Sequence, residues 1–205
     1  MHVDLLGPAG RIEGLLESPD SPRFAALVLH PHPLFGGTMH NHATYQIAKG
    51  ARLAGGASLR IQFRGVGLSE GTHGGGPGEL ADARAALLWL SGRHPGLPLL
   101  VGGMSFGSWI ALQLSCADPE VEGVLAAGLA SRTLELGFLP DCPKRVAAIQ
   151  ASADEFGPVE EVERLMAGPP ERRRLALLGG ATHLFLEDLA GLQREARAAW
   201  EWLAA

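Results

Sequence analysis

The stretch that decides the fold runs from Leu97 to Ala117 and reads LPLLVGGMSFGSWIALQLSCA. Its first part, Leu97–Gly102, is a short apolar run that predicts a buried strand, and its last part, Phe106–Ala117, predicts a helix. Between them, Gly103–Gly107 has the pattern G-x-S-x-G. A strand that reverses into a helix over so few residues strains the backbone of the central residue, and small neighbours prevent collisions. The segment therefore predicts a serine, Ser105, presented at the carboxyl edge of a sheet.

Short apolar runs alternate with longer helical patterns on both sides of this segment. A mostly parallel sheet with helices on both faces requires that alternation, so we predict one α/β domain over residues 1–205 with an antiparallel hairpin at its start. The expected strands cover residues 3–7, 11–17, 25–29, 57–63, 97–102, 121–127, 144–151 and 174–178. The expected helices cover about 42–54, with Asn41 as N-cap, 79–92, 106–117, 159–167 and 187–203.

The composition excludes several classes of protein. The chain has 205 residues, with 17 basic and 22 acidic side chains and a formal net charge of −5 at pH 7. That length suits one self-sufficient core, and a mildly acidic balance offers no surface for nucleic acid or anionic lipid. Two cysteines, Cys116 and Cys142, are too few for a disulfide scaffold or a cysteine-only zinc site. Taken as free thiols, they favour a cytoplasmic protein.

Two stretches have unusual compositions. Pro95–Ala117 carries no charge and is long enough to cross a membrane, but Pro98 and the Gly102–Gly103 pair interrupt it. We therefore expect no membrane segment, and the N-terminus lacks the basic region and apolar stretch of a signal peptide. The second stretch, Gly71–Gly78, belongs to a glycine excess of 28 residues and is predicted to be a flexible loop.

Ser105 needs a partner before its hydroxyl can react. A serine hydroxyl is inert near neutral pH unless a base accepts its proton, so a histidine must reach the same edge of the sheet. His183 lies between the last expected strand and the last expected helix. A loop in that position carries an imidazole over Ser105, whereas His73 and His94 lack this placement. The sequence therefore favours His183 as the base.

The imidazole in turn needs an acid that holds its tautomer and stabilises its charged form. Asp154 follows the expected strand over 144–151 and so lies at the same edge of the sheet. Glu155 is its direct neighbour and Asp141 precedes that strand, so both stay open as alternatives. We therefore predict Asp154 as the acid of this site.

Four motifs along the chain resemble those of the α/β-hydrolase superfamily. They are His30–Asn41, Phe63–Gly71, Gly103–Gly107 and Ala181–His183. The chain looks most like the small lidless bacterial serine hydrolases related to dienelactone hydrolases and carboxylesterases. This resemblance implies the α/β-hydrolase fold, the order serine, aspartate, histidine along the chain, and ester hydrolysis without a cofactor.

The resemblance also assigns an oxyanion hole. His30–Pro33 matches the family's His-Gly-x-Pro loop, which implies that the backbone N–H groups of His32 and Phe106 stabilise the oxyanion. Two departures matter. The acid loop of the family usually reads Gly-Asp-x-Asp, whereas here it is Ala151–Asp154. Position 105 is a serine where dienelactone hydrolases use cysteine, so their particular activity is not implied.

A metal site is a different interpretation of the histidine-rich segment. His30, His32, His40 and His42 fall within thirteen residues, and an H-x-H pair on an extended segment can bind zinc. Prolines constrain the first pair and no carboxylate is nearby, and the oxyanion loop already accounts for the segment. We therefore expect no metal.

The predicted reaction is hydrolysis of a small soluble carboxylic ester through an acyl-enzyme. Two alternatives stay open. The same residues can hydrolyse a thioester or an amide, and a non-catalytic protein can bind a ligand or partner on this scaffold. The presence of a serine, a histidine and an aspartate at the expected places favours the enzyme.

The resemblance further implies an open site. Lids in this superfamily usually follow the strand after the nucleophile helix, and here residues 128–143 are too few for a cap domain. An open, modestly apolar cleft favours small esters over long-chain lipid. Seven apolar residues on loops or turns near the site are expected to line the acyl pocket: Leu34, Phe35, Leu129, Phe138, Leu139, Phe156 and Phe185.

Overall fold

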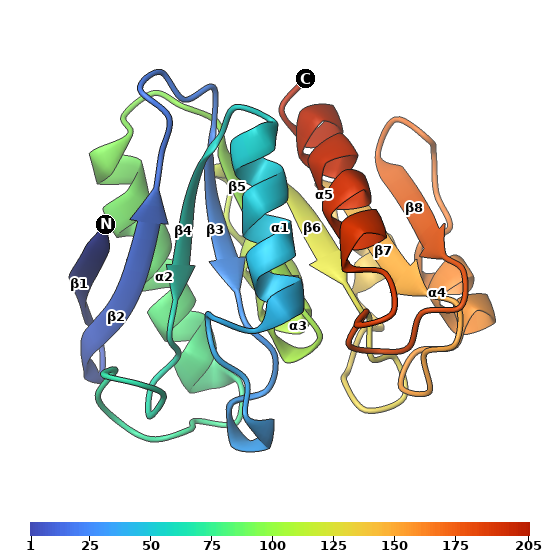
Figure 1. Cartoon of the computed structure of the whole chain (residues 1–205), viewed down its shortest axis with the longest axis horizontal. Helices are drawn as coiled ribbons and strands as arrows, with labels where there is room; N and C mark the ends of the chain where they lie inside the picture. The colour runs from blue at the N-terminus through green and yellow to red at the C-terminus, as the bar shows by residue number, and fades with distance from the viewer.

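Eight strands form one sheet in the computed structural model, which describes residues 1–205 (Figure 1). The strands are β1 (His2–Gly7), β2 (Gly10–Glu17), β3 (Ala25–Leu29), β4 (Ala57–Ile61), β5 (Leu99–Met104), β6 (Val121–Ala127), β7 (Arg145–Ala151) and β8 (Arg173–Leu178). The helices are α1 (His42–Leu53), α2 (Pro77–Arg93), α3 (Phe106–Ala117), α4 (Val159–Leu165) and α5 (Leu189–Leu203), with 3-10 turns η1 (Pro33–Phe35) and η2 (Leu139–Asp141).

The sheet is mostly parallel, in the order β1-β2-β4-β3-β5-β6-β7-β8. β2 is the only strand that runs opposite to the rest of the sheet, and it pairs antiparallel with both β1 and β4. The remaining pairs are parallel. The expected α/β architecture with an antiparallel hairpin at its start is confirmed, and the strands from β3 to β8 all end at one edge (Figure 1).

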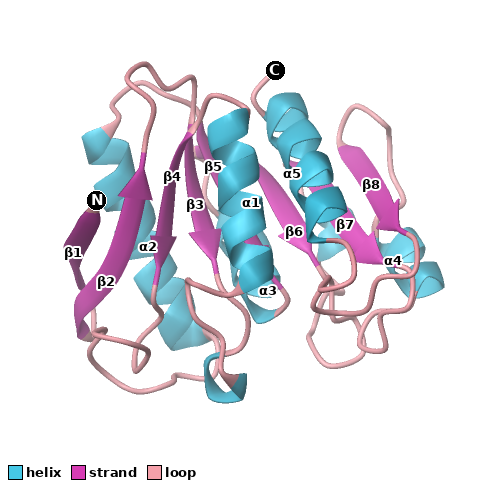
Figure 2. Cartoon of the chain, in the orientation of Figure 1, coloured by secondary structure: helices cyan, strands magenta, loops and turns pink.

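Two apolar clusters sandwich the sheet. Helices α1 and α5 lie side by side over one face, and α2, α3 and α4 cover the other (Figure 2). Trp200 of α5 is fully buried in the first cluster, and its Nε1 donates to the carbonyl of Ile47 in α1 at 3.0 Å. A buried indole N–H needs such a partner, so this bond both satisfies the Trp200 ring and joins the two helices.

The observed ends of strands and helices differ most from the expected ends near prolines. The strand expected over 97–102 is β5, which begins after Pro98 and continues to Met104, because proline has no N–H for the ladder and β6 pairs as far as Met104. The helix expected from Glu79 begins at Pro77, since proline is well suited to the first helical turn. None of the helices combines the length and the apolar character that crossing a membrane requires.

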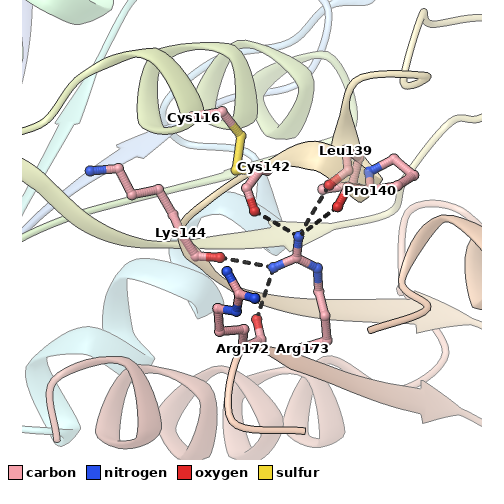
Figure 3. Close-up of a disulfide and its surroundings, with 7 residues drawn as sticks. All are labelled: Cys116, Leu139, Pro140, Cys142, Lys144, Arg172 and Arg173. Carbon is pink, nitrogen blue, oxygen red and sulfur yellow. Dashed lines mark hydrogen bonds between the residues drawn. A yellow bond between two sulfur atoms is a disulfide. The ribbon is translucent and has the colours of Figure 1, made fainter. Parts of the chain in front are cut away.

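The expectation of free thiols is wrong. Cys116 and Cys142 form a disulfide that ties the end of α3 to the segment before β7, with the two Cα atoms 5.1 Å apart (Figure 3). The residues meet because α3 runs back along the sheet and ends near the start of β7. Beside the disulfide, the Arg173 guanidinium donates to the carbonyls of Cys142 and Lys144, each at 2.8 Å. The argument for a cytoplasmic protein from free thiols therefore loses its premise.

Candidate active site

The turn around Ser105 has the strained geometry that its sequence predicts. Ser105 joins β5 to α3 with φ of 53° and ψ of −116°, a left-handed region that residues with a side chain rarely adopt. A Cβ on Gly103 would collide with the backbone of Gly107, and a Cβ on Gly107 would collide with the carbonyl of Leu29. Close backbone packing therefore requires both glycines, and it leaves the Ser105 side chain facing outward at the end of β5.

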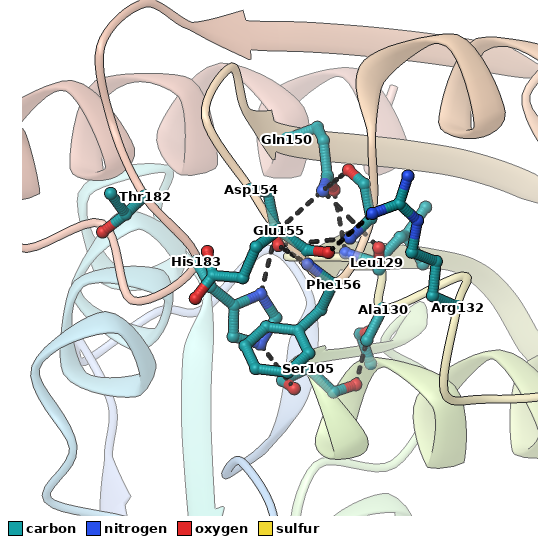
Figure 4. A network of polar contacts seen from close by, with 12 residues as sticks. Ser105, Leu129, Ala130, Arg132, Gln150, Asp154, Glu155, Phe156, Thr182 and His183 are labelled. Carbon is teal, nitrogen blue, oxygen red and sulfur yellow. Dashed lines mark hydrogen bonds and ion pairs between the residues drawn. The ribbon is translucent and has the colours of Figure 1, made fainter.

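His183 and Asp154 form a hydrogen-bonded line with Ser105. The Oγ of Ser105 lies 2.8 Å from Nε2 of His183, and Nδ1 of His183 lies 2.8 Å from Oδ2 of Asp154 (Figure 4). The Asp154 side chain is fully buried and that of His183 is 11% exposed. A carboxylate only accepts, so Nδ1 of His183 carries the proton and Nε2 faces the serine hydroxyl as an acceptor.

The loops after β5, β7 and β8 bring these three side chains together, although 78 residues separate Ser105 from His183. The two alternative acids lie elsewhere. Glu155 is exposed at the rim of the cleft, and Asp141 belongs to η2, before β7 begins. The geometry therefore favours Asp154 as the acid over Glu155 and Asp141.

Asp154 is held by a network that the sequence prediction missed. Its Oδ1 accepts the N–H groups of Phe156 and Gly157, and its Oδ2 accepts Nε2 of Gln150 at 2.8 Å (Figure 4). Gln150 is fully buried and also bonds the N–H of Leu129 and the carbonyl of Gly157, each at 2.8 Å. One signal was present in the sequence: Gln150 is an uncharged polar residue in the otherwise apolar end of β7.

Two further contacts order the loops beside the site. Ser152, where the related family has an aspartate, accepts the N–H of Gly180 at 2.8 Å and so joins the loops after β7 and β8. Glu187 accepts both the N–H and the hydroxyl of Thr182, next to His183. The N–H of Thr182 is the main reason that the pKa of the Glu187 carboxyl is lowered. These contacts hold the loop that carries His183 without touching the His183 imidazole.

The four histidines of the expected oxyanion segment occupy different environments. His30 is fully buried, where Nε2 accepts the N–H of Phe63 and burial lowers its pKa to about 4. His32 lines the cleft beside Ser105, whereas His40 and His42 are exposed. No group of three or more His, Cys, Asp and Glu side chains in the chain could hold a metal ion.

The backbone N–H groups of His32 and Phe106 face no competing partner. Neither takes part in the hydrogen bonds of the turns, loops and helix caps. Phe106 is the first residue of α3, where the helix dipole favours negative charge. Both residues line the cleft that contains Ser105 and His183. These two N–H groups therefore suit a negatively charged oxygen beside the serine.

The cleft at the site has a volume of about 390 Å³. Of the seven apolar residues expected to line it, only Phe35 and Phe156 do so; Leu129, Leu139 and Phe185 are fully buried in the core, Phe138 packs against the core, and Leu34 points into solvent. The apolar lining also includes Ala130, Leu134 and Leu184. A larger depression of about 850 Å³ near Met1, Arg52 and His94 shares no residue with this cleft.

Known proteins resemble the chain over most of its length. A candidate alpha/beta hydrolase of unknown function from Agrobacterium tumefaciens has a TM-score of 0.88 and 35% identity, over 97% of this chain and 94% of that one. A serine hydrolase without a lid from Xanthomonas campestris has a TM-score of 0.88 and 25% identity, over 97% and 92%. An uncharacterized protein from Rickettsia prowazekii is 38% identical over 189 residues, which are 87% of this chain and 79% of that protein. No family model matches the sequence.

Proposed function

Because the chain belongs to the small α/β serine hydrolases without a lid, we propose that it hydrolyses small carboxylic esters through an acyl-enzyme on Ser105. The observation that carries the proposal is the hydrogen-bonded line from Asp154 through His183 to Ser105, with 2.8 Å at each step. Ser105, at one end of that line, lies in the lining of the cleft, where a carbonyl carbon can reach its Oγ.

Acylation begins when Oγ of Ser105 attacks the ester carbonyl and its proton passes to Nε2 of His183. The buried Asp154 carboxylate stabilises the imidazolium that forms. The carbonyl oxygen becomes an oxyanion that accepts the N–H groups of His32 and Phe106, and one such donor is worth roughly 3–4 kcal/mol in comparable sites. His183 then gives its proton to the leaving alkoxide, so that the alcohol departs and the acyl group stays on Ser105.

Deacylation repeats these steps with water. Nε2 of His183 removes a proton from a water molecule, whose oxygen attacks the acyl carbon and forms a second oxyanion. Collapse of that intermediate breaks the bond to Oγ, and the proton on His183 returns to Ser105. The products are one carboxylic acid and one alcohol, and the three side chains end in their starting states.

The dimensions of the cleft favour a short acyl group. Its volume of about 390 Å³ lies near the lower end for small-molecule sites. The lining includes apolar side chains such as Leu134 and Phe156, which suit an alkyl or aryl substituent, and polar side chains such as Thr133 and Thr182. A small substrate with both apolar and polar groups fits this lining.

The test is covalent labelling together with hydrolysis. A fluorophosphonate should label the wild-type protein with a stoichiometry near one, and Ser105→Ala should abolish both labelling and hydrolysis of p-nitrophenyl acetate. Thermal unfolding of Ser105→Ala shows that the variant is folded. A wild-type protein that is neither labelled nor active would favour the non-catalytic binding protein, and labelling that survives in Ser105→Ala would assign the nucleophile to another residue.

A further inference from the structure

The glycine-rich stretch Gly71–Gly78, expected to be a flexible loop, is folded back onto the first turn of α2. Glu79 reaches back from that turn, so that its Oε1 accepts the N–H of Gly74 and its Oε2 the N–H of Gly76, each at 2.8 Å. Burial alone would raise the pKa of this carboxyl, but the two N–H groups and the nearby His73 outweigh burial and lower the pKa. A buried, ionised Glu79 therefore holds the loop.

Glycine is required where this loop meets the nucleophile helix. Gly76 has φ of 115°, and a Cβ at this position would lie 2.6 Å from the ring of Trp109 in α3. A Cβ on Gly78 would lie 2.6 Å from the guanidinium of Arg64, which pairs with the buried Asp82 at 2.7 Å. Gly76 in the loop thus packs directly on α3, and Gly78 in the first turn of α2 packs on the Arg64–Asp82 pair.

The loop carries one imidazole, that of His73, which lies beside the cleft-lining residues His32 and Phe106. Nδ1 of His73 lies 2.9 Å from Oε1 of Glu79, and only 17% of the His73 side chain is exposed. The centre of its ring lies 4.9 Å from the centre of the His32 ring and 5.8 Å from that of Phe106. The His73 imidazole therefore packs beside both residues proposed to bind the oxyanion, close to the Glu79 carboxylate.

The His32 ring is enclosed on several sides. It packs on Phe35 and on Phe106, with 4.8 Å between ring centres in each pair, and on His73. Its Nδ1 accepts the N–H of Leu34 at 3.2 Å. Burial and the neighbouring His73 lower the pKa of His32, so its ring stays neutral at pH 7. These ring contacts surround the His32 side chain, and its backbone carbonyl accepts the N–H groups of Phe35 and Gly37.

We propose that His73 is a positioning residue of the oxyanion site and acts through the rings of His32 and Phe106. The proposal rests on the proposed function, in which the backbone N–H groups of those two residues bind the oxyanion. Such donors must meet the oxygen at about 2.7–3.1 Å, and a displacement near 1 Å can cost about a hundredfold in rate. His73 keeps both residues in place, so its loss lowers turnover while the ground-state binding of the acyl group is unchanged.

Two substitutions separate ring packing from every other role of His73. With p-nitrophenyl acetate, His73→Ala is expected to lower kcat roughly 10- to 100-fold and to leave KM within about twofold. Affinity for a trifluoromethyl ketone, which forms a tetrahedral adduct on the serine, should fall by the same factor as kcat/KM. His73→Phe restores a ring between His32 and Phe106, so its kcat should return to within about threefold of wild type.

His94→Ala is the matched control. His94 is half-buried like His73 but follows α2 at its other end, so wild-type kinetics are expected. If His73→Ala does not fold, His73→Leu, which fills the space without an aromatic ring, carries the same expectation. An unchanged kcat, a change in KM alone, or a His73→Phe variant as slow as His73→Ala would overturn the proposal. Failure of the proposed function is recognised separately, because the wild-type protein itself would then neither hydrolyse the ester nor react with the fluorophosphonate.

Discussion

Replacing Gln150 by leucine tests how the acid of the site is held. Leucine has a similar size but forms no hydrogen bonds, so Gln150→Leu removes the bonds to Leu129, Asp154 and Gly157, each of 2.8 Å. Gln150 is fully buried, and water cannot replace the missing partners without opening the core. The substitution therefore changes both the stability of the fold and the orientation of the Asp154 carboxylate.

The loss of stability follows from the groups left without a partner. The N–H of Leu129 and the carbonyl of Gly157 are backbone groups, and an unsatisfied buried group costs roughly 1–3 kcal/mol. Two of them give a loss of roughly 2–6 kcal/mol, against a net stability of about 5–15 kcal/mol for a typical domain. For a chain of this length the melting temperature should fall by at least about 4 °C. Differential scanning calorimetry measures this change.

The loss of activity in Gln150→Leu should be smaller than the loss caused by removing Asp154 itself. Asp154 still accepts the N–H groups of Phe156 and Gly157 and the Nδ1–H of His183. Replacing the triad aspartate by asparagine in the well-studied serine proteases costs about 10⁴ in kcat, which sets the upper limit. We expect Gln150→Leu to lower kcat by roughly 10- to 100-fold, with KM within about twofold, when it is assayed well below its melting temperature.

Gln62→Leu is the matched control for this experiment. Gln62 is also buried, but its side chain makes one hydrogen bond, to the N–H of Met39 at 2.9 Å, and contacts none of the three proposed catalytic residues. It should lose less stability than Gln150→Leu and keep a kcat near that of the wild type. Equal losses of kcat in the two variants, or a melting temperature for Gln150→Leu that matches Gln62→Leu, would refute the reasoning.

Three further predictions concern the substrate, the disulfide and pH. Among p-nitrophenyl esters, kcat/KM should be highest for acyl chains of about two to four carbons, because the cleft holds about 390 Å³; a maximum at long chains would contradict an open site for small esters. Reduction of Cys116–Cys142, which closes a loop of 26 residues, should cost about 3.5 kcal/mol and lower the melting temperature by roughly 7–14 °C; complete reduction without a shift would exclude a structural role. Burial lowers the pKa of His30 from 6.5 to about 4, so the unfolded chain takes up this proton first and the free energy of unfolding falls by about 1.4 kcal/mol per unit as pH drops from 6.5 toward 4. Urea unfolding at pH 7 and pH 5 measures that loss, and an NMR signal of His30 that titrates above pH 6 would contradict it.

Much of the fold could be predicted because its signals are local. β3, α3 and β6 have the bounds expected from the sequence, since each is a run of apolar or helix-forming residues between clear breaks. The strand expected over 57–63 ends instead at Ile61. The backbone N–H of Gln62 still donates to the carbonyl of Glu13 in β2, but that of Phe63 donates to Nε2 of His30, so the ladder stops there.

The lining of the cleft could not be predicted, because an apolar residue on a loop packs wherever the loop directs it. Phe185 has φ of 57° and is fully buried against α1 and α5, whereas its neighbours Leu184 and Leu186 are exposed. Phe35 lines the cleft while the adjacent Leu34 does not. One backbone angle reverses the direction of a side chain, and residue type carries no information about that angle.

The sequence by itself determined the order of strands and helices, the serine turn at the end of β5, and the two loops that supply His183 and Asp154. Those features are encoded by short patterns, since a sharp turn needs small residues and each loop simply follows an apolar strand. The tertiary structure decided the rest: the pairing of Cys116 with Cys142, the hold of Gln150 on Asp154, and the place of His73 beside His32. Each of these depends on where side chains point after distant segments pack together, and no local pattern of residues specifies that direction.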